Sequence, residues 1–402
     1  MRRPTFPDMT PDPQTPPRLL SLDVYRGAVM LLLAFNGLGL ASLAADTDSA
    51  FLDWLGFHQS HPEWISQFRF IGVAAWDMIQ PAFMFIVGVA VPYSFAKRQA
   101  LGESRAEIFR HGCWRALLLI LLGVFLQSTR SGQTNWLFTN VLSQIGLGYG
   151  FLLLLAGRSY RTQLLAAFGL LVFTWLIYAL YPIGDPASFA DAAKVAPGTL
   201  PGFFGHWSIH SNAGAAFDRW FLNLFPRSEP FVSQSGGYQT INFIPAAATM
   251  ILGLVCGQVL RDEAFSPGKK LRLFLIGGAI CLVLGATLGM TVVPVVKRIW
   301  TPSWALLSGA YTVWILALFY WAIDVRGWKS WTFPVVIVGM NPLTMFVLGS
   351  TLRGWITGQL HIHLPDFLFA KPWGNVVDAT LAGLVLWLIC LWMYRRKIFI
   401  RL

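Results

Sequence analysis

Ten long apolar segments alternate along the chain with shorter polar connections. Each apolar segment holds 18 residues or more, and about 20 residues at 1.5 Å per residue cover the hydrocarbon core of a bilayer. The pattern therefore predicts an all-α, polytopic membrane protein with about ten transmembrane helices. The expected spans are 22–44, 76–96, 111–128, 137–157, 163–182, 241–260, 271–294, 303–323, 331–352 and 376–394.

Basic residues cluster in alternate connections, which is how membrane topology is set. The N-terminal tail, the C-terminus and every second connection are rich in Lys and Arg, so both termini are expected to face the cytoplasm. Residues 1–20, with several prolines and no periodicity, are predicted to form a disordered cytoplasmic tail before a single transmembrane domain, 21–402. The outer loop 183–240 is rich in Gly, Pro, Trp and Phe, and we expect it to fold over the mouth of the bundle.

Composition narrows the class further. The chain is 55% hydrophobic and carries a net charge of +11. Because the cations lie between apolar spans, they indicate topology rather than nucleic-acid binding. The four cysteines fall in or beside spans and imply no disulfide framework. The first apolar segment is too long for the apolar region of a cleavable signal peptide, so a multi-pass protein held in membrane lipid is expected.

Polar side chains within or beside the apolar segments mark candidate functional positions. Asp77 and Gln80 open the second span, and ionisable groups at such positions usually face a polar cavity or a partner. Including Gln80, amides occur within or beside the predicted spans at Asn36, Gln80, Gln144, Gln239, Asn242 and Asn341. Each amide alone can serve only to bridge two helices. Together they predict a polar passage through the bundle.

Six of the seven histidines fall on the expected outer side. They suggest a vestibule that handles protons or ligands, although loop histidines can also be plain polar surface. His206 and His210 would share one face if their segment is helical. His361 and His363 could bind a metal on a strand, but no converging Cys or acidic group supports this, and no metal is expected.

Asp23 and Arg26 lie three residues apart at the cytoplasmic edge of the first span. They can simply pair with each other. Alternatively, Arg26 can guide an anionic cofactor at a channel mouth. Arg110, Arg115 and Lys270 are further candidates, although topology alone accounts for these cations.

Six motifs resemble the heparan-α-glucosaminide N-acetyltransferase family of transmembrane acyltransferases, in its bacterial branch. They occur in the family's order across nearly the whole chain. The motifs are SLDVYRGAVMLL (21–32), WDMIQPAFMFIVGVAVPYS (76–94), NVLSQIGLGY (140–149), GGYQTINFIPAAATMILG (236–253), KRIWTPSWALLS (297–308) and VGMNPLTMFV (338–347).

The resemblance implies acetyl-CoA as the donor and a sugar amino or hydroxyl group on the outer side as the acceptor. It implies a location in the bacterial inner membrane and permits a homodimer. It also implies a catalytic histidine in an H-x-x-W-x-G pattern ahead of Asp77. Here the segment 67–77 reads QFRFIGVAAWD, with Phe70 at the tryptophan position, Gly72 matching and no histidine.

Acetyl transfer from a thioester needs a base, oxyanion donors and a cofactor pocket. His61 is the preferred base, Asp77 can orient it, and Asn36 is the nearest match to an asparagine of the family. Substrate binding is expected at His206, His210, Gln239, Asn341 and Gln80, and Asn341 is a second candidate oxyanion donor. Cofactor binding is expected at Arg26, Asp23 and Gln144.

Two other function classes stay open at this stage. The same cavity could belong to a transporter or to a flippase of lipid-linked sugars without acyl chemistry, which the absent motif histidine favours. A scaffold subunit of an envelope complex is a third possibility.

Overall fold

The structure is a computed structural model that describes residues 19–61, 64–65 and 73–400. The predicted tail, Phe70 and Gly72 lie outside these residues. The described part is helical throughout, with no strand. Its α-helices are α1 (Leu20–Ala34), α2 (Leu40–Ala45), α3 (Ala50–His58), α4 (Ile79–Ala100), α5 (Arg105–Ser128), α6 (Val141–Leu155), α7 (Tyr160–Ala179), α8 (Ala192–Val195), α9 (Ala213–Phe221), α10 (Phe243–Arg261), α11 (Pro267–Thr291), α12 (Pro302–Phe319), α13 (Phe333–Gly339), α14 (Pro342–Thr351), α15 (Arg353–His363) and α16 (Gly374–Arg395). Short 3₁₀ turns that matter below are η1 (Asn36–Gly39), η3 (Trp76–Met78), η6 (Gly202–Trp207), η8 (Thr240–Asn242) and η9 (Lys297–Ile299).

The predicted class, an all-α membrane protein, is confirmed. Among the described residues, 7 helices are long and apolar enough to cross a bilayer, and up to 9 if each of two bent helix pairs counts as one span. Each of the ten predicted segments contains a helix. The segment expected at 137–157 holds only the 15-residue helix α6, which is shorter than the other spans.

Two spans are broken by local backbone chemistry. The first bends by 43° between α1 and α2, where Gly37, Leu38 and Gly39 all have positive φ. The ninth bends by 79° between α13 and α14, just before Pro342, because a residue that precedes proline is disfavoured in helical conformation. Pro81 causes no comparable break: α4 runs on, and Pro81 lies in its first turn, where its missing N–H costs nothing.

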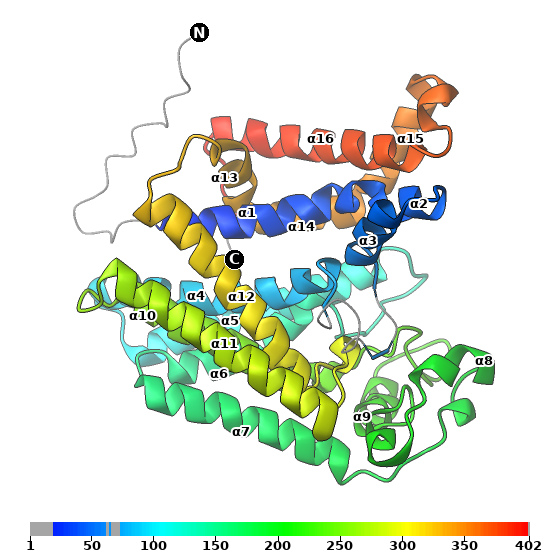
Figure 1. The fold of residues 1–402 in the computed structure, drawn as a ribbon, viewed down its shortest axis with the longest axis horizontal. Helices are drawn as coiled ribbons and strands as arrows, with labels where there is room; N and C mark the ends of the chain where they lie inside the picture. Colours follow the sequence, from blue (N-terminus) through cyan, green and yellow to red (C-terminus); the bar gives the residue numbers. More distant parts are fainter. Residues whose placement is uncertain (1–18, 62–63, 66–72, 401–402) are drawn as a thin grey trace.

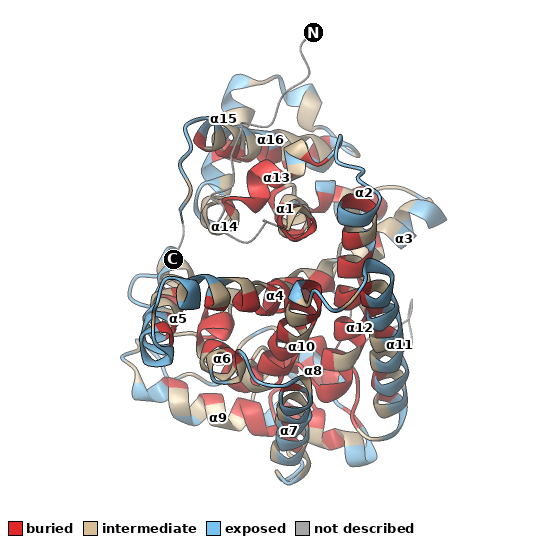
Figure 2. Ribbon diagram, turned by 90° about the vertical axis from the view of Figure 1, so that its left-hand side faces the viewer, coloured by how far each residue is buried: buried red, intermediate tan, exposed pale blue. Residues whose placement is uncertain are grey.

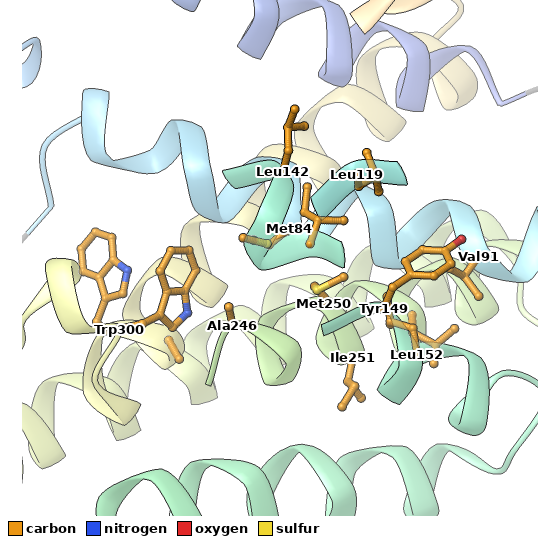
Figure 3. Close-up of a cluster of buried hydrophobic side chains, with 14 of the residues drawn as sticks. Met84, Val91, Leu119, Leu142, Tyr149, Leu152, Ala246, Met250, Ile251 and Trp300 are labelled. Carbon is orange, nitrogen blue, oxygen red and sulfur yellow. The ribbon is translucent and has the colours of Figure 1, made fainter. Parts of the chain in front are cut away.

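The helices form two groups (Figures 1 and 2). One group holds α1 and α13 to α16, and the other holds α4 to α7 and α10 to α12. The long helices run roughly parallel in Figure 1, with α2, α3, α8 and α9 gathered at one end of the bundle. The largest buried cluster lies inside the second group, where Met84, Tyr149 and Met250 pack among α4, α6 and α10 (Figure 3).

Helices α4 and α10 approach closely because both carry glycine at the contact. A Cβ on Gly88 would lie 1.9 Å from the carbonyl oxygen of Met250, and one on Gly253 would lie 2.0 Å from that of Phe85. Small residues permit this backbone-to-backbone contact in membrane helices. Helix α4 is thereby fixed at the centre of its group, with Asp77 just ahead of it.

Helices α7 and α11 present apolar side chains outward. Phe168, Phe173, Ile280 and Val283 are all more than half exposed. A soluble helix would put such residues inward, so these two helices are suited to contact lipid.

The loop 183–240 is folded, as expected. It contains α8, α9 and several 3₁₀ turns, and Trp207 is fully buried in it. Its apolar cluster includes Tyr178 of α7 and Val296, which precedes η9. The loop therefore packs against the ends of the spanning helices.

Candidate functional site

Four side chains from separate segments meet beside the first turn of α4. Oδ1 of Asp77 lies 2.6 Å from Nδ1 of His61 and 3.2 Å from Nζ of Lys297. Nζ of Lys297 donates to the hydroxyl oxygen of Tyr238 at 2.7 Å and lies 3.5 Å from Nδ1 of His61. We call these four residues the Asp77 cluster. Its carboxylate is buried, whereas the His61 side chain is 44% exposed and open to a reactant.

The local sequence explains how the cluster forms. Gly237 has φ 76, and a Cβ there would lie 2.5 Å from the ring of Trp64, so only glycine fits between Trp64 and Tyr238. The indole nitrogen of Trp64 donates to the carbonyl of Trp207 at 2.9 Å and anchors the segment after His61 to the outer loop.

Lys297 is held by a buried turn between α11 and α12. The Val296 N–H donates to the hydroxyl oxygen of Thr301 at 3.0 Å, and Val296 and Ile299 are fully buried on either side of Lys297. The side chain of Asn242 donates to the carbonyl of Arg298 at 2.8 Å, which ties η8 to η9. The ammonium is therefore fixed in place as well as buried.

The roles of the two partners in the contact between His61 and Asp77 depend on the tautomer of the ring. When Asp77 is ionised, its carboxylate can only accept a hydrogen bond, and the 2.6 Å contact then corresponds to a proton on Nδ1 of His61. Nε2 of the neutral ring is then left with a lone pair. A histidine oriented by a carboxylate in this way is the arrangement used for general base catalysis.

His206 and His210 belong to the outer loop, whereas His58 lies near the segment that precedes Asp77. Nδ1 of His206 donates to the carbonyl of Tyr181 at 2.7 Å. His210 is buried in a turn with φ 61, and burial, followed by the nearby Arg219, lowers its pKa. Because η6 ends at Trp207, the shared helical face expected for His206 and His210 is not formed. The Ala75 N–H donates to His58 at 3.3 Å, and burial lowers the pKa of His58.

His361 and His363 lie on helix α15, not on a strand, which was the condition for their sharing a metal ion. Residues two apart on a helix point in different directions. Nε2 of His361 contacts Asp378 at 2.9 Å, and its ring stacks on Phe369. No group of three or more potential metal-ligating side chains occurs within the described ranges.

The buried amides have partners of their own. Gln239 accepts from the hydroxyl of Tyr178 and donates to Asn212 at 2.6 Å. Gln144 donates to the carbonyls of Phe138 and Thr240 at 2.8 and 3.0 Å.

Asn341 is also engaged at both ends of its amide. It donates to the Ile398 carbonyl and accepts from the Ile400 N–H, both at 3.0 Å, so it holds the segment that follows α16. The expectation that the intramembrane amides converge on one passage is therefore wrong for these side chains. Each one completes the hydrogen bonding of a nearby loop or helix break.

Asn36 and Gln80 lie nearer the Asp77 cluster. Asn36 is exposed in the left-handed turn between α1 and α2. A Cβ on the next residue, Gly37, would meet the side chains of Gln59 and Trp76, which flank the cluster in sequence. Gln80 is half-buried in the first turn of α4.

A basic cavity of about 540 Å³ lies between the two helix groups, among α1, α14, α4, α5 and α6. Arg26, Lys97 and Arg115 line it, together with Tyr93 and Tyr149. Asp23 also lines it and pairs with Arg26 at 3.4 Å, as one interpretation of the sequence expected. Gln144, predicted to bind the cofactor, is not among its lining residues.

Arg115 is the most suggestive cation of this cavity. Its guanidinium lies 5.5 Å from the ring centroid of Tyr149, and its buried Nε has no hydrogen-bond partner among the described residues. A buried N–H without a partner is costly. An anionic ligand could satisfy it, and the planar guanidinium suits a phosphate.

A second cavity of about 640 Å³ is lined by apolar residues of α1, α4 and α12, with Trp54 and His58 of α3 at its edge. Neither cavity is lined by Asn36, Asp77, Gln239 or Asn341.

Sequence reasoning identified His61, Asp77 and Arg26 but assigned no role to Lys297 or Tyr238. Both lie within motifs, 236–253 and 297–308, that served only to indicate the family. The available signal was a Lys–Arg pair, Lys297 and Arg298, in a short outer connection, because the outer side of this chain is otherwise poor in cations.

Comparison with known proteins gives two curated relatives. The human heparan-alpha-glucosaminide N-acetyltransferase is 22% identical over 426 residues, which cover 96% of this chain and 60% of the human protein. The mouse protein of the same name is 24% identical and covers 95% of this chain. The chain thus spans about 60% of the length of these relatives. No family model matches the chain.

Proposed function

We propose, from its similarity to the two heparan-alpha-glucosaminide N-acetyltransferases, that the chain is a distant member of their family and a transmembrane acetyltransferase. The donor is acetyl-CoA from the cytoplasm, and the acceptor is an amino or hydroxyl group of a sugar on the outer side of a bacterial inner membrane. The observation that carries the proposal is the 2.6 Å contact between His61 and Asp77. It supplies an oriented base in a chain that lacks the family's motif histidine.

The proposed reaction uses His61 twice. Nε2 of the neutral ring accepts a proton from the acceptor while the acceptor's nitrogen or oxygen attacks the thioester carbonyl carbon. The carbon–sulfur bond then breaks, and the departing thiolate takes the proton from the imidazolium. The products are an acetylated sugar and free CoA. Asn36, exposed at the break after α1, is the proposed donor to the developing oxyanion.

The basic cavity is the proposed CoA site. Arg26, Lys97 and Arg115 suit its phosphates, and the apolar lining suits its arm. Phe83 is the first residue of α4 in this lining. It follows Asp77 by six residues, which is about 9 Å along a helix. An acetyl group carried past Phe83 would therefore arrive near His61.

The test is transfer of radiolabelled acetyl from acetyl-CoA to a panel of amino sugars by the purified full chain. We expect His61→Ala to lower the rate by about 10²–10⁴-fold, the usual contribution of a general base. His363→Ala is the matched control, because His363 is exposed on α15 outside the cluster. Full transfer by His61→Ala would refute the mechanism, and sugar binding without labelled product would favour a carrier.

A further inference from the structure

Lys297 is a buried cation placed against the proposed base. Its side chain is only 9% exposed, and its ammonium lies 3.2 Å from Oδ1 of Asp77 and 3.5 Å from Nδ1 of His61. The ammonium thus reaches both members of the His61–Asp77 pair. Neither the relatives' names nor the sequence motifs give this lysine a role.

The charges at these distances decide which form of His61 is stable. A carboxylate beside a histidine favours the protonated imidazolium, whereas a neighbouring cation disfavours it. A general base must be neutral before it can accept a proton. A His61–Asp77 pair alone would therefore deplete the useful form of His61 near neutral pH, and Lys297 opposes this effect.

Tyr238 holds the ammonium in this position. Its hydroxyl oxygen accepts from Nζ at 2.7 Å, and its ring centroid lies 4.9 Å from the same nitrogen. The next cation along the chain, Arg298, points its guanidinium to the carbonyl of Gly236 at 3.3 Å. Among the described residues, the charged and titratable groups that contact His61 are Asp77 from η3 and Lys297 from η9, with Tyr238 bound to Lys297.

We propose that Lys297 is a positioning residue that keeps His61 neutral, and therefore basic, at neutral pH. It does so by balancing the charge of Asp77 while leaving that carboxylate free to orient the ring. The catalytic meaning of this arrangement rests on the proposed acetyltransferase function, whereas the electrostatic effect itself does not.

The test uses carbethoxylation of His61 by diethyl pyrocarbonate, which modifies only the neutral ring. Rates are measured for the full chain from pH 5 to 9 by mass spectrometry of the peptide that contains His61. We expect Lys297→Met to move the midpoint of this titration up by about one pH unit. Asp77→Asn should move it down, and Lys297→Arg, which retains the charge, should leave it in place.

The opposite signs separate this role from a structural one. If Lys297 only supported the fold, both Lys297→Met and Asp77→Asn would bring the midpoint toward about 6.5, the value of a solvated histidine. That convergence, or an unmoved midpoint in Lys297→Met, would overturn the inference. Lys297→Gln replaces Lys297→Met if the latter does not fold. Tyr238→Phe, which removes no charge, should shift the midpoint less than Lys297→Met does.

Activity separates the inference from the proposed function. In an active acetyltransferase, the acidic limb of the kcat/KM profile should move up in Lys297→Met by the same amount as the carbethoxylation midpoint. A midpoint that moves as expected in a protein that transfers no acetyl group would support the charge balance and overturn the proposed function.

Discussion

The basic cavity makes a quantitative prediction about CoA binding. Arg115 contributes a guanidinium whose buried Nε has no partner among the described residues. A hydrogen bond to a charged group contributes about 1.5–3 kcal/mol, and each 1.4 kcal/mol is a factor of ten in affinity. Arg115→Gln should therefore weaken binding of CoA by about 10–100-fold.

Isothermal titration of the detergent-purified protein with CoA and with acetyl-pantetheine isolates the phosphate contribution. Acetyl-pantetheine carries the thioester arm without the nucleotide phosphates. Its affinity should change by less than about threefold in Arg115→Gln, because the lost contact is charge-assisted and directed to a phosphate.

Arg98→Gln is the matched control. Arg98 lies near the same end of α4 but pairs with Glu103 at 2.8 Å and does not line the cavity. An exposed ion pair of this kind contributes only about 0–1 kcal/mol to stability, so this variant should fold and bind CoA as the parent does. Unchanged CoA affinity in Arg115→Gln, or an equal loss for CoA and acetyl-pantetheine, would refute the assignment of the cavity.

Three further predictions concern stability, each measured on the purified protein. Gly88→Ala should lower the free energy of unfolding by about 1–3 kcal/mol, because the new Cβ would lie 1.9 Å from the carbonyl oxygen of Met250. Gly150→Ala is the control in the same thermal melts, and it should be nearly neutral because a Cβ there would have no neighbour within 4 Å. Burial raises the pKa of Asp218 from 3.8 to about 7. The protonated side chain therefore contributes its full stability to the folded protein below about pH 4, and about 4 kcal/mol of this stability is lost as the pH rises toward 8. The melting temperature should depend less on pH in Asp218→Asn over this range, and an unchanged dependence would contradict the assignment. Asn341→Ala should release the segment after α16, seen as faster proteolysis near Ile400 with the melting temperature of the bundle little changed.

The fold was largely predictable because membrane spans are determined by length and apolarity. The helical segment Trp76–Ala100, formed by η3 and α4, coincides with the expected span 76–96 except for one further turn at its end. The breaks were harder to predict. Pro342 and Pro81 both lie in the first turn of a helix, but Asn341 before Pro342 is non-helical, whereas the residues before Pro81 continue into η3. Proline therefore lies near the start of a helix in both places but marks a bend in only one.

The candidate site was predictable only where the chemistry of one residue requires a partner. An intramembrane aspartate requires a partner, so the contact between Asp77 and His61 follows from the cost of an unpaired buried charge. The amides did not predict a polar passage, because an amide side chain can both donate and accept a hydrogen bond and so can be satisfied by nearby backbone groups. Asn341 thereby satisfies a carbonyl and an N–H of the C-terminal segment, and it needs no cavity.

The role of Lys297 could not be predicted from the sequence, because it depends on contacts between residues that are distant in the chain. Lys297 is buried because its neighbours Val296 and Ile299 pack under the outer loop. The loop residues of this cluster lie 50 or more positions earlier in the sequence. A lysine desolvated in this way needs an anion, and the structure supplies Asp77 at 3.2 Å. The carboxylate must therefore serve two cations when His61 is protonated but only one when His61 is neutral. In the proposed mechanism, the four residues of the cluster carry no net charge while His61 is neutral, because one carboxylate balances one ammonium. Protonation of His61 would then give the cluster a net positive charge, which transfer of the proton to the departing thiolate would remove.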